Sequence, residues 1–201
     1  MQFKDGIRRC NWIKDDFDYL KYHDKEWGAP QYNDQKLFEL LVLESAEAGL
    51  NWLMILKKRE NYRVAYDNFN PNIVAEFNEE KVLQLLNNKG IIRSKLKIKS
   101  SINNAKRFLE IQKQYGSFSN YIWSYVDHKP ILNNWKTTED VPDETSLSKT
   151  ICKDMKEKGC TFIGARIIYA FMQAIGMVND HPAYCFKYHG NASNAKSNYS
   201  F

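Results

Sequence analysis

Two cysteines and two histidines at opposite ends of the chain have the residue types of a single metal site. They are spaced C-x12-H and H-x3-C, at Cys10, His23, His181 and Cys185. Two thiolates and two imidazoles form a ligand set of structural zinc, and four protein ligands leave no coordination position open for catalysis. We therefore expect a structural zinc that joins the two ends of one domain. The spacing matches no standard zinc finger, so two packed cysteines, a core histidine and a surface histidine are the alternative.

A carboxylate interrupts an apolar stripe in residues 37–52. At helical spacing, four residues of this segment share one face: Leu37, Leu41, Glu44 and Ala48. Because an unpaired buried carboxylate is costly, Glu44 either has an internal partner or faces a pocket. Trp52 follows near the same stripe, and together the two residues favour a pocket for a flat polar group. Glu39 and Glu47 lie off the stripe, and we expect them in solvent.

Aromatic residues surround one of the proposed metal ligands. Four of them bracket His23 in the sequence: Trp12, Tyr19, Tyr22 and Trp27. Core packing explains most of them, whereas a stacking cage for a base explains those next to the ligand.

A long basic stretch runs from Lys81 to Leu109 without a single Asp or Glu. It holds eight basic residues: Lys81, Lys89, Arg93, Lys95, Lys97, Lys99, Lys106 and Arg107. Within it, residues 85–93 indicate a helix, a glycine turn and a second helix, whose start can bind a phosphate without reading a base. The usual second glycine of a helix-hairpin-helix motif is replaced by Ile92. An ordinary helical hairpin with a solvated basic face is the alternative.

The overall composition is that of a globular domain, and its net positive charge slightly favours an anionic partner. The chain has 201 residues, 14% aromatic residues and a formal net charge of +5, enough for one domain with a sizeable core. No basic stretch followed by an apolar run begins the chain, and no apolar run reaches the roughly 18 residues of a membrane span. We therefore expect neither a signal peptide nor a membrane partner. With Cys152 and Cys160 the cysteines number four, which in an intracellular protein favours metal ligands or free thiols over disulfides.

The periodicity predicts an all-α protein. Expected helices cover Phe17–Glu26, Gln35–Ala48, Tyr62–Phe69, Pro71–Phe77, Glu79–Asn88, Lys95–Tyr115, Ser117–Val126, Leu147–Lys158 and Ala165–Ile175. No segment shows the strict alternation of a strand. Asn133–Glu144 is polar and indicates a surface loop, and the Asn/Ser-rich tail over residues 191–201 indicates disorder.

Taken together, the residues and segments described above resemble the bacterial 3-methyladenine DNA glycosylase I family. The matching strings are CNW at residues 10–12, YHDKEWG at 22–28, LESAEAGLNW at 43–52, LKKRENY at 56–62, GIIR at 90–93 and VNDH at 178–181. The resemblance covers roughly Arg9 to Tyr188. It implies a single helix-hairpin-helix glycosylase domain over residues 1–190, with a zinc that joins the N- and C-termini through Cys10, His23, His181 and Cys185.

The resemblance also implies a role for each matching residue. Glu44 corresponds to the glutamate that recognises the base, and it is the residue we expect to be catalytic. The expected base-binding aromatic residues are Trp12, Tyr22, Trp27 and Trp52. The expected contacts to the DNA backbone are Gly90, Ile91, Arg93 and Lys95. Like the family, the chain lacks the catalytic aspartate of most hairpin glycosylases, since no Asp lies between Asp67 and Asp127. It departs from the family at Asn51 and at Glu47, where an extra carboxylate either shifts the base preference or faces solvent.

The implied activity is hydrolysis of the N-glycosidic bond of 3-methyladenine in alkylated double-stranded DNA. We expect a monofunctional, cytoplasmic monomer that leaves an abasic site and needs no obligate protein partner. Two other functions fit the same residues. One is a damaged-DNA sensor without catalysis, and the other is a zinc-stabilised helical module that binds RNA or protein.

Overall fold

The computed structural model describes residue 3 and residues 5–188, and within that part the chain is almost entirely helical. Its helices are α1 (Phe17–Lys25), α2 (Asp34–Glu47), α3 (Trp52–Ala65), α4 (Pro71–Ala75), α5 (Glu79–Asn87), α6 (Lys95–Tyr115), α7 (Phe118–Ser124), α8 (Ser146–Glu157) and α9 (Ala165–Ala174). Two 3-10 turns, η1 (Asp67–Phe69) and η2 (Thr138–Asp140), complete the helical elements. The predicted all-α class is confirmed, and the predicted tail over residues 191–201 lies outside the described residues.

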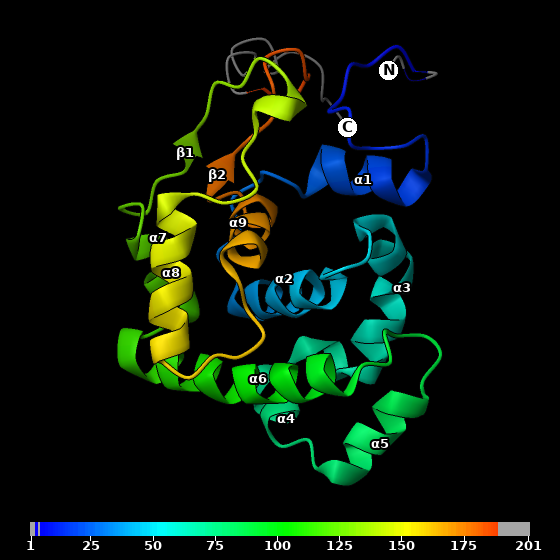
Figure 1. Cartoon of the computed structure of the whole chain (residues 1–201), viewed down its shortest axis with the longest axis vertical. Coiled ribbons are helices and arrows are strands. Elements are labelled where there is room, and N and C mark those ends of the chain that lie inside the picture. The colour runs from blue at the N-terminus through cyan, green and yellow to red at the C-terminus, as the bar shows by residue number, and fades with distance from the viewer. Residues whose placement is uncertain (1–2, 4, 189–201) are drawn as a thin grey trace, which may run out of the picture.

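Two central helices carry the rest of the fold. In Figure 1, α2 and α9 lie in the middle of the view, α6 runs below them, α7 and α8 lie to the left, and α1 and α3 lie to the right. The N-terminal segment meets the segment after β2 (Val178–Asn179), where the backbone N–H of Phe186 donates to the carbonyl of Arg8 at 2.9 Å. Both ends of the described chain therefore belong to one end of the molecule.

Polar caps fix where the important helices start. The side chain of Asn33 accepts a hydrogen bond from the backbone of Lys36 at 3.0 Å, and that of Asn51 accepts one from Met54 at 3.0 Å. Each cap satisfies an N–H that the helix itself leaves unpaired, a contribution of about 1 kcal/mol. Asn51 thereby sets Trp52 as the first residue of α3, directly after the turn that ends α2.

The predicted helix over Tyr62–Phe69 is wrong at both ends. Helix α3 starts ten residues earlier, at Trp52, and ends at Ala65. It has no single apolar stripe because Ile55 and Leu56, neighbours in sequence, pack into two different cores. Its end is forced by the run Asp67, Asn68 and Phe69, whose φ angles of 48°, 54° and 58° are incompatible with a right-handed helix.

The buried side chains form two clusters. The larger joins most helices and includes the stacked rings of Phe108 and Phe118, with centroids 4.1 Å apart. The smaller lies at the N-terminal end and consists of Phe3, Cys10, Ile13, Tyr19, Tyr22, Trp27, Leu56 and Cys185. Trp52 packs against both clusters. Trp52, a residue predicted to bind a base, therefore lies at the boundary between the two hydrophobic clusters.

Glu39 is buried, and its expected position in solvent is wrong. Only 2% of its surface is exposed. Its carboxylate pairs with Arg59 at 2.6 Å and Arg63 at 2.7 Å on α3, and with Lys36 at 2.9 Å. Two arginines spaced four residues apart on the neighbouring helix supply the charge that makes this burial possible.

Two very short strands escaped the periodicity analysis. β1 (Ile131–Leu132) and β2 pair in parallel over two residues each. A pairing of that length leaves no alternation to detect. The loop predicted over Asn133–Glu144 follows β1 and contains η2. Within the described residues, no helix is both long enough and apolar enough to cross a membrane.

Candidate functional site

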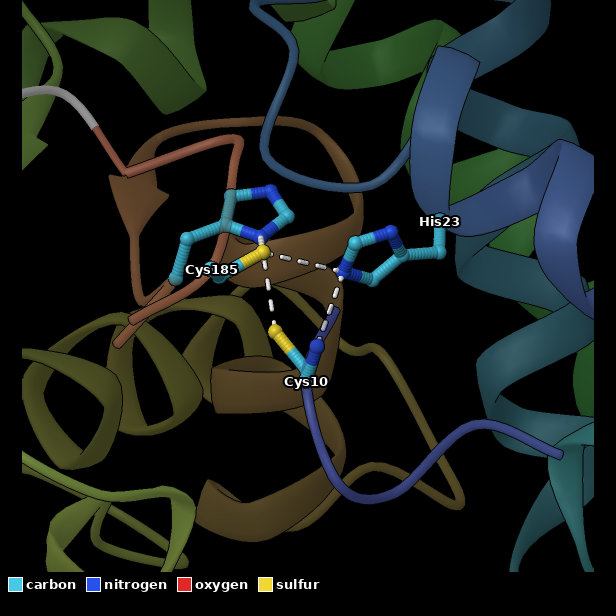
Figure 2. A group of neighbouring side chains, drawn as sticks. Cys10, His23 and Cys185 are labelled. Atoms are coloured by element: carbon cyan, nitrogen blue, oxygen red, sulfur yellow. Dashed lines mark hydrogen bonds between the residues drawn. The ribbon is translucent and has the colours of Figure 1, made fainter. Parts of the chain in front are cut away.

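The four residues predicted to bind a metal converge at the end of the molecule where the chain ends meet. Their ligand atoms all lie within 4.8 Å of one another, and all four residues are buried. Cys185 Sγ lies 3.5 Å from His23 Nε2 and 3.4 Å from His181 Nδ1, and Cys10 Sγ lies 3.5 Å from the same His181 nitrogen. A tetrahedral ion with bonds of about 2.0–2.3 Å spaces its ligands roughly 3.3–3.8 Å apart. Three ligand pairs therefore have the spacing of such an ion, and Figure 2 shows Cys10, His23 and Cys185 pointing toward a common centre.

Both imidazoles are held from behind by hydrogen bonds. His23 Nδ1 forms a hydrogen bond with Asp24 Oδ1 at 2.8 Å, and Asp24 in turn accepts a hydrogen bond from the Arg9 guanidinium at 2.7 Å. His181 Nε2 bonds to the backbone oxygen of Trp27 at 3.2 Å. These contacts fix which nitrogen of each ring faces the cluster, as outer contacts do in metal sites. They also connect the cluster to Trp27, which lines the adjacent cavity.

A cavity of about 230 Å³ lies next to this cluster, and all five residues predicted to recognise the base line it. They are Trp12, Tyr22, Trp27, Glu44 and Trp52. They come from the N-terminal segment, α1 and its end, α2, and the first residue of α3. Seven further residues complete the wall: Glu47, Thr138, Val141, Ala170, Gln173, Asp180 and Pro182.

The aromatic residues form a rigid wall. The ring centroids of Trp12 and Trp27 are 5.0 Å apart at an interplanar angle of 71°, and those of Tyr22 and Trp52 are 5.1 Å apart at 53°. These edge-on and tilted contacts hold each ring in place against its neighbour. The indole N–H of Trp52 is buried and has no acceptor among the described residues. The wall thus presents flat faces together with one unpaired donor.

Glu44 is the buried acid of the cavity. It is 6% exposed, and within the described part of the chain its carboxyl forms no hydrogen bond or ion pair. Burial, with a smaller contribution from the charge of Glu47, raises the pKa of Glu44 to about 8. Burial and the nearby Glu44 also raise the pKa of Tyr22 well above its usual value. A positive, hydrogen-bonding ligand would supply what this acid lacks.

Asp180 is a residue of the cavity wall that the sequence analysis missed. It is 1% exposed, and its carboxylate accepts hydrogen bonds of 2.6–2.8 Å from four side chains: Asn133, Trp135, Tyr169 and Gln173. Two donors belong to the loop after β1 and two to α9, so Asp180 ties the loop to the helix. That connection places Thr138 and Val141 of the loop in the wall. The only sequence signal was the position of Asp180 next to His181.

The predicted DNA-backbone residues lie together in the turn between α5 and α6, beside α3. The Gly90 N–H donates to Asn88 Oδ1 at 2.8 Å, and a Cβ on Gly90 would meet Asn61 Cβ at 2.9 Å, so the glycine permits close packing on α3. Ile91 is buried, whereas Arg93 and Lys95 are exposed. The side chains available to a phosphate at this turn are therefore those of Arg93 and Lys95.

Lys97, from the same basic stretch, is used inside the protein. Its Nζ donates to the carbonyl oxygens of Ala46 and Ala48 at 2.8 and 2.7 Å. These are carbonyls at the C-terminal end of α2, where a helix leaves its acceptors unpaired and favours positive charge. One lysine of the basic stretch thus holds the end of the helix that carries Glu44.

Comparisons with known proteins agree with this geometry. The family model described as methyladenine glycosylase matches residues 12–188. DNA-3-methyladenine glycosylase 1 of Escherichia coli (strain K12) is 43% identical over 92% of this chain and 99% of its own length. A crystal structure of 3-methyladenine DNA glycosylase I covers 90% of this chain and 100% of its own, with 43% identity and a TM-score of 0.87. A tyrosine-to-phenylalanine variant of such an enzyme, solved in complex with 3-methyladenine, covers 88% of this chain and 95% of its own, with 36% identity and a TM-score of 0.85.

Proposed function

This chain belongs to the methyladenine glycosylase family, and we propose from that membership how its own residues excise a damaged base. It is a DNA glycosylase of base-excision repair that releases 3-methyladenine from damaged DNA. The observation that carries the proposed mechanism is the buried, unpaired carboxyl of Glu44 in an aromatic cavity.

Recognition starts from the charge of the substrate. An adenine methylated at N3 is a cation while it is attached to the sugar, and it leaves as a neutral base. It therefore needs no general acid. The enzyme must instead take the nucleotide out of the stack, which costs a few kcal/mol and costs least for a damaged base. In the cavity, Glu44 accepts hydrogen bonds from the adenine edge and favours its positive charge.

The aromatic wall supplies the stacking surface. Trp52 stacks on the flipped base, and Tyr22, 5.1 Å from it between ring centroids, hydrogen-bonds the base through its hydroxyl. Trp12 and Trp27 close the cavity on the side of the metal cluster. The faces of these rings also attract a cation, by about 0.5–2 kcal/mol for each well-placed ring.

Bond cleavage then relies on the leaving group rather than on a strong nucleophile. As the glycosidic bond lengthens, positive charge passes from the base to the sugar, and water attacks C1′. Among the described residues, no lysine lines the cavity, which supports a monofunctional enzyme that forms no Schiff base and leaves an abasic site.

The metal in this proposal is a structural zinc held by Cys10, His23, His181 and Cys185. The donor set and the 3.4–3.5 Å spacing support it. With four protein ligands the ion closes the fold, and its effect on the cavity passes through the bond between His181 and Trp27.

The DNA partner in this proposal is double-stranded, and the enzyme acts as a cytoplasmic monomer. Gly90 and Ile91 shape the turn between α5 and α6, and Arg93 and Lys95 bind phosphates there. The exposure of both basic side chains supports this assignment, because phosphate contacts position the protein without reading sequence.

The test is chromatography of free bases released from methylated duplex DNA by the metal-loaded protein. We expect free 3-methyladenine to be released from the DNA. The Glu44→Gln variant should release it more slowly than the native protein, and the Glu76→Gln variant should release it at the native rate. Glu76 is exposed and lies outside the cavity, so its variant makes the same change in charge without touching the site. Folded protein that binds the damaged duplex but releases no base would favour the damage-sensing function.

A further inference from the structure

The cavity holds a second carboxylate besides Glu44. Glu47 also lines the wall. It is half-buried and is the last residue of α2, three positions after Glu44. Residues three apart on a helix lie on the same face, so both acids approach the cavity from one side.

Glu47 stands in an electrostatically unfavourable place. A helix C-terminus carries partial negative charge and disfavours a carboxylate. Lys97 is the cation whose charge acts on Glu47, but its Nζ is bound to the carbonyls of Ala46 and Ala48. Within the described residues Glu47 has no ion pair closer than 4 Å. Its charge is therefore compensated only in part by the protein.

The charged and titratable groups around Glu47 leave the cavity negative. On α1 these are the neutral hydroxyls of Tyr19 and Tyr22, and on α6 the group is Lys97. Across the cavity is Asp180, which is bound by four donors. Among the described residues, the cation whose charge acts on Glu47 is Lys97, and Arg59 of α3 acts on Tyr22. Glu44 itself is more than nine-tenths buried without a partner.

We propose that Glu47 is a specificity-determining residue: with Glu44 it forms a carboxylate pair that accepts a positively charged alkylated base in preference to an uncharged base of the same shape. The proposal rests on the proposed function. A cation in the cavity offsets both charges, whereas a neutral base leaves two like charges close together in a poorly solvated space. Because the positive charge moves to the sugar during cleavage, Glu47 acts mainly on capture of the base.

The two acids also share a proton. Burial and the charge of Glu47 raise the pKa of Glu44, so one of the pair is protonated near neutral pH. Burial raises the pKa of Glu47 as well, with a smaller opposing effect from the charge of Lys97, and the pair gains negative charge as the pH rises above 8. Removing the charge of Glu47 lowers the pKa of Glu44 only in part, because burial is the larger cause. At pH 7 the native pair carries less than its full charge, so the effect of the substitution on capture of the base is smaller there.

The experiment compares Glu47→Gln with the native enzyme on two substrates. The first is duplex DNA with 3-methyladenine, for which release gives KM and kcat. The second is the same duplex with 3-deaza-3-methyladenine, an uncharged base of the same shape, for which binding gives Kd. At pH 9 we expect Glu47→Gln to raise KM by about tenfold, to change kcat by less than about twofold, and to leave Kd for the uncharged base unchanged. At pH 7 the rise in KM should be smaller.

Two further variants make the result decisive. Glu47→Asp keeps the charge and should retain most of the preference, and Glu76→Gln controls for the added net charge. Should Glu47→Gln melt at a much lower temperature than the native protein, Glu47→Ala replaces it. Equal losses on both bases, no loss on the cation, or the same rise in KM at both pH values would overturn the proposal. Absence of 3-methyladenine release by the native enzyme would instead overturn the proposed function.

Discussion

The two polar sites of this protein lie side by side but differ in how their groups are paired. In the cluster of Cys10, His23, His181 and Cys185, every imidazole nitrogen faces either a thiol or an outer acceptor, and Asp24 and Arg9 extend the network. In the cavity, the Glu44 carboxyl and the Trp52 indole N–H have no partner among the described residues. A site whose contacts are complete within the protein serves the fold. A site with buried groups left unpaired carries a cost in stability and is suited to a ligand.

The largest expected effect is the loss of the proposed zinc. Cys185→Ser removes one of the four proposed ligands, and a chelator removes the proposed ion itself. Either change should lower the free energy of unfolding by about 5 kcal/mol or more. Thermal melting and zinc content per chain measure this. Cys152→Ala is the matched control, because Cys152 is buried outside the cluster and should keep its zinc. A metal-free chain that melts at the native temperature would show that the cluster serves no structural purpose.

Glu44→Gln should have opposite effects on activity and on stability. The amide keeps the shape but cannot ionise when the cationic base binds, so kcat/KM for release of 3-methyladenine should fall by about a hundredfold. The same change removes the cost of burying an acid, and the variant should melt above the native protein at neutral pH. A variant that is both less active and less stable would show that Glu44 also supports the fold.

The pH dependence of that stability difference has a defined sign. The pKa of Glu44 is raised by burial from an ordinary 4.5 to about 8, so the folded state favours the protonated acid. Its contribution is complete below about pH 4.5 and is lost as the pH rises toward 8. Relative to Glu44→Gln, the native protein should therefore lose about 3 kcal/mol between pH 5 and pH 8. Denaturant unfolding at both pH values measures this, and parallel curves would contradict the raised pKa.

Asp180→Asn tests whether the cavity depends on its paired groups as well. Asp180 accepts from four donors, and an amide must turn its NH2 toward two of them. We expect a loss of about 2 kcal/mol in stability and slower excision, because Thr138 and Val141 move with the loop. Asp143→Asn in the same loop, where the side chain is 73% exposed, should change neither. Normal excision by a destabilised Asp180→Asn would show that the loop does not shape the cavity.

The smallest effect is expected at the turn between α5 and α6. Arg93→Ala should weaken binding to any duplex by up to about 1 kcal/mol and reduce the slope of log affinity against log salt by about 1. Lys153→Ala on α8, 80% exposed, makes the same charge change elsewhere and should leave the slope unchanged. If the Arg93→Ala variant keeps the native slope of log affinity against log salt, Arg93 does not contact the DNA backbone.

The sequence was most informative where a residue type is rare in its setting. Two cysteines with two histidines predicted that four distant side chains would converge, and an acid on a leucine stripe pointed to Glu44, before any contact was known. It failed where a partner from elsewhere in the chain decides the outcome. Arg59 makes burial of Glu39 possible, and four donors from two segments define Asp180. Lys97 was part of a predicted basic face but binds the end of α2, a contact between residues about 50 positions apart.

The distance in sequence between the metal ligands has a consequence for biosynthesis. Cys10 and His181 are 171 residues apart, which takes roughly ten to thirty seconds to translate. Throughout that time Cys10 and His23 have emerged without their partners, and the proposed ion can be held by all four ligands only after the last helix has been made. A chain cut short before His181 lacks two ligands and remains open at its N-terminal end. Zinc incorporation would thus mark completed molecules, and the unclosed fragments would be left to chaperones and proteases.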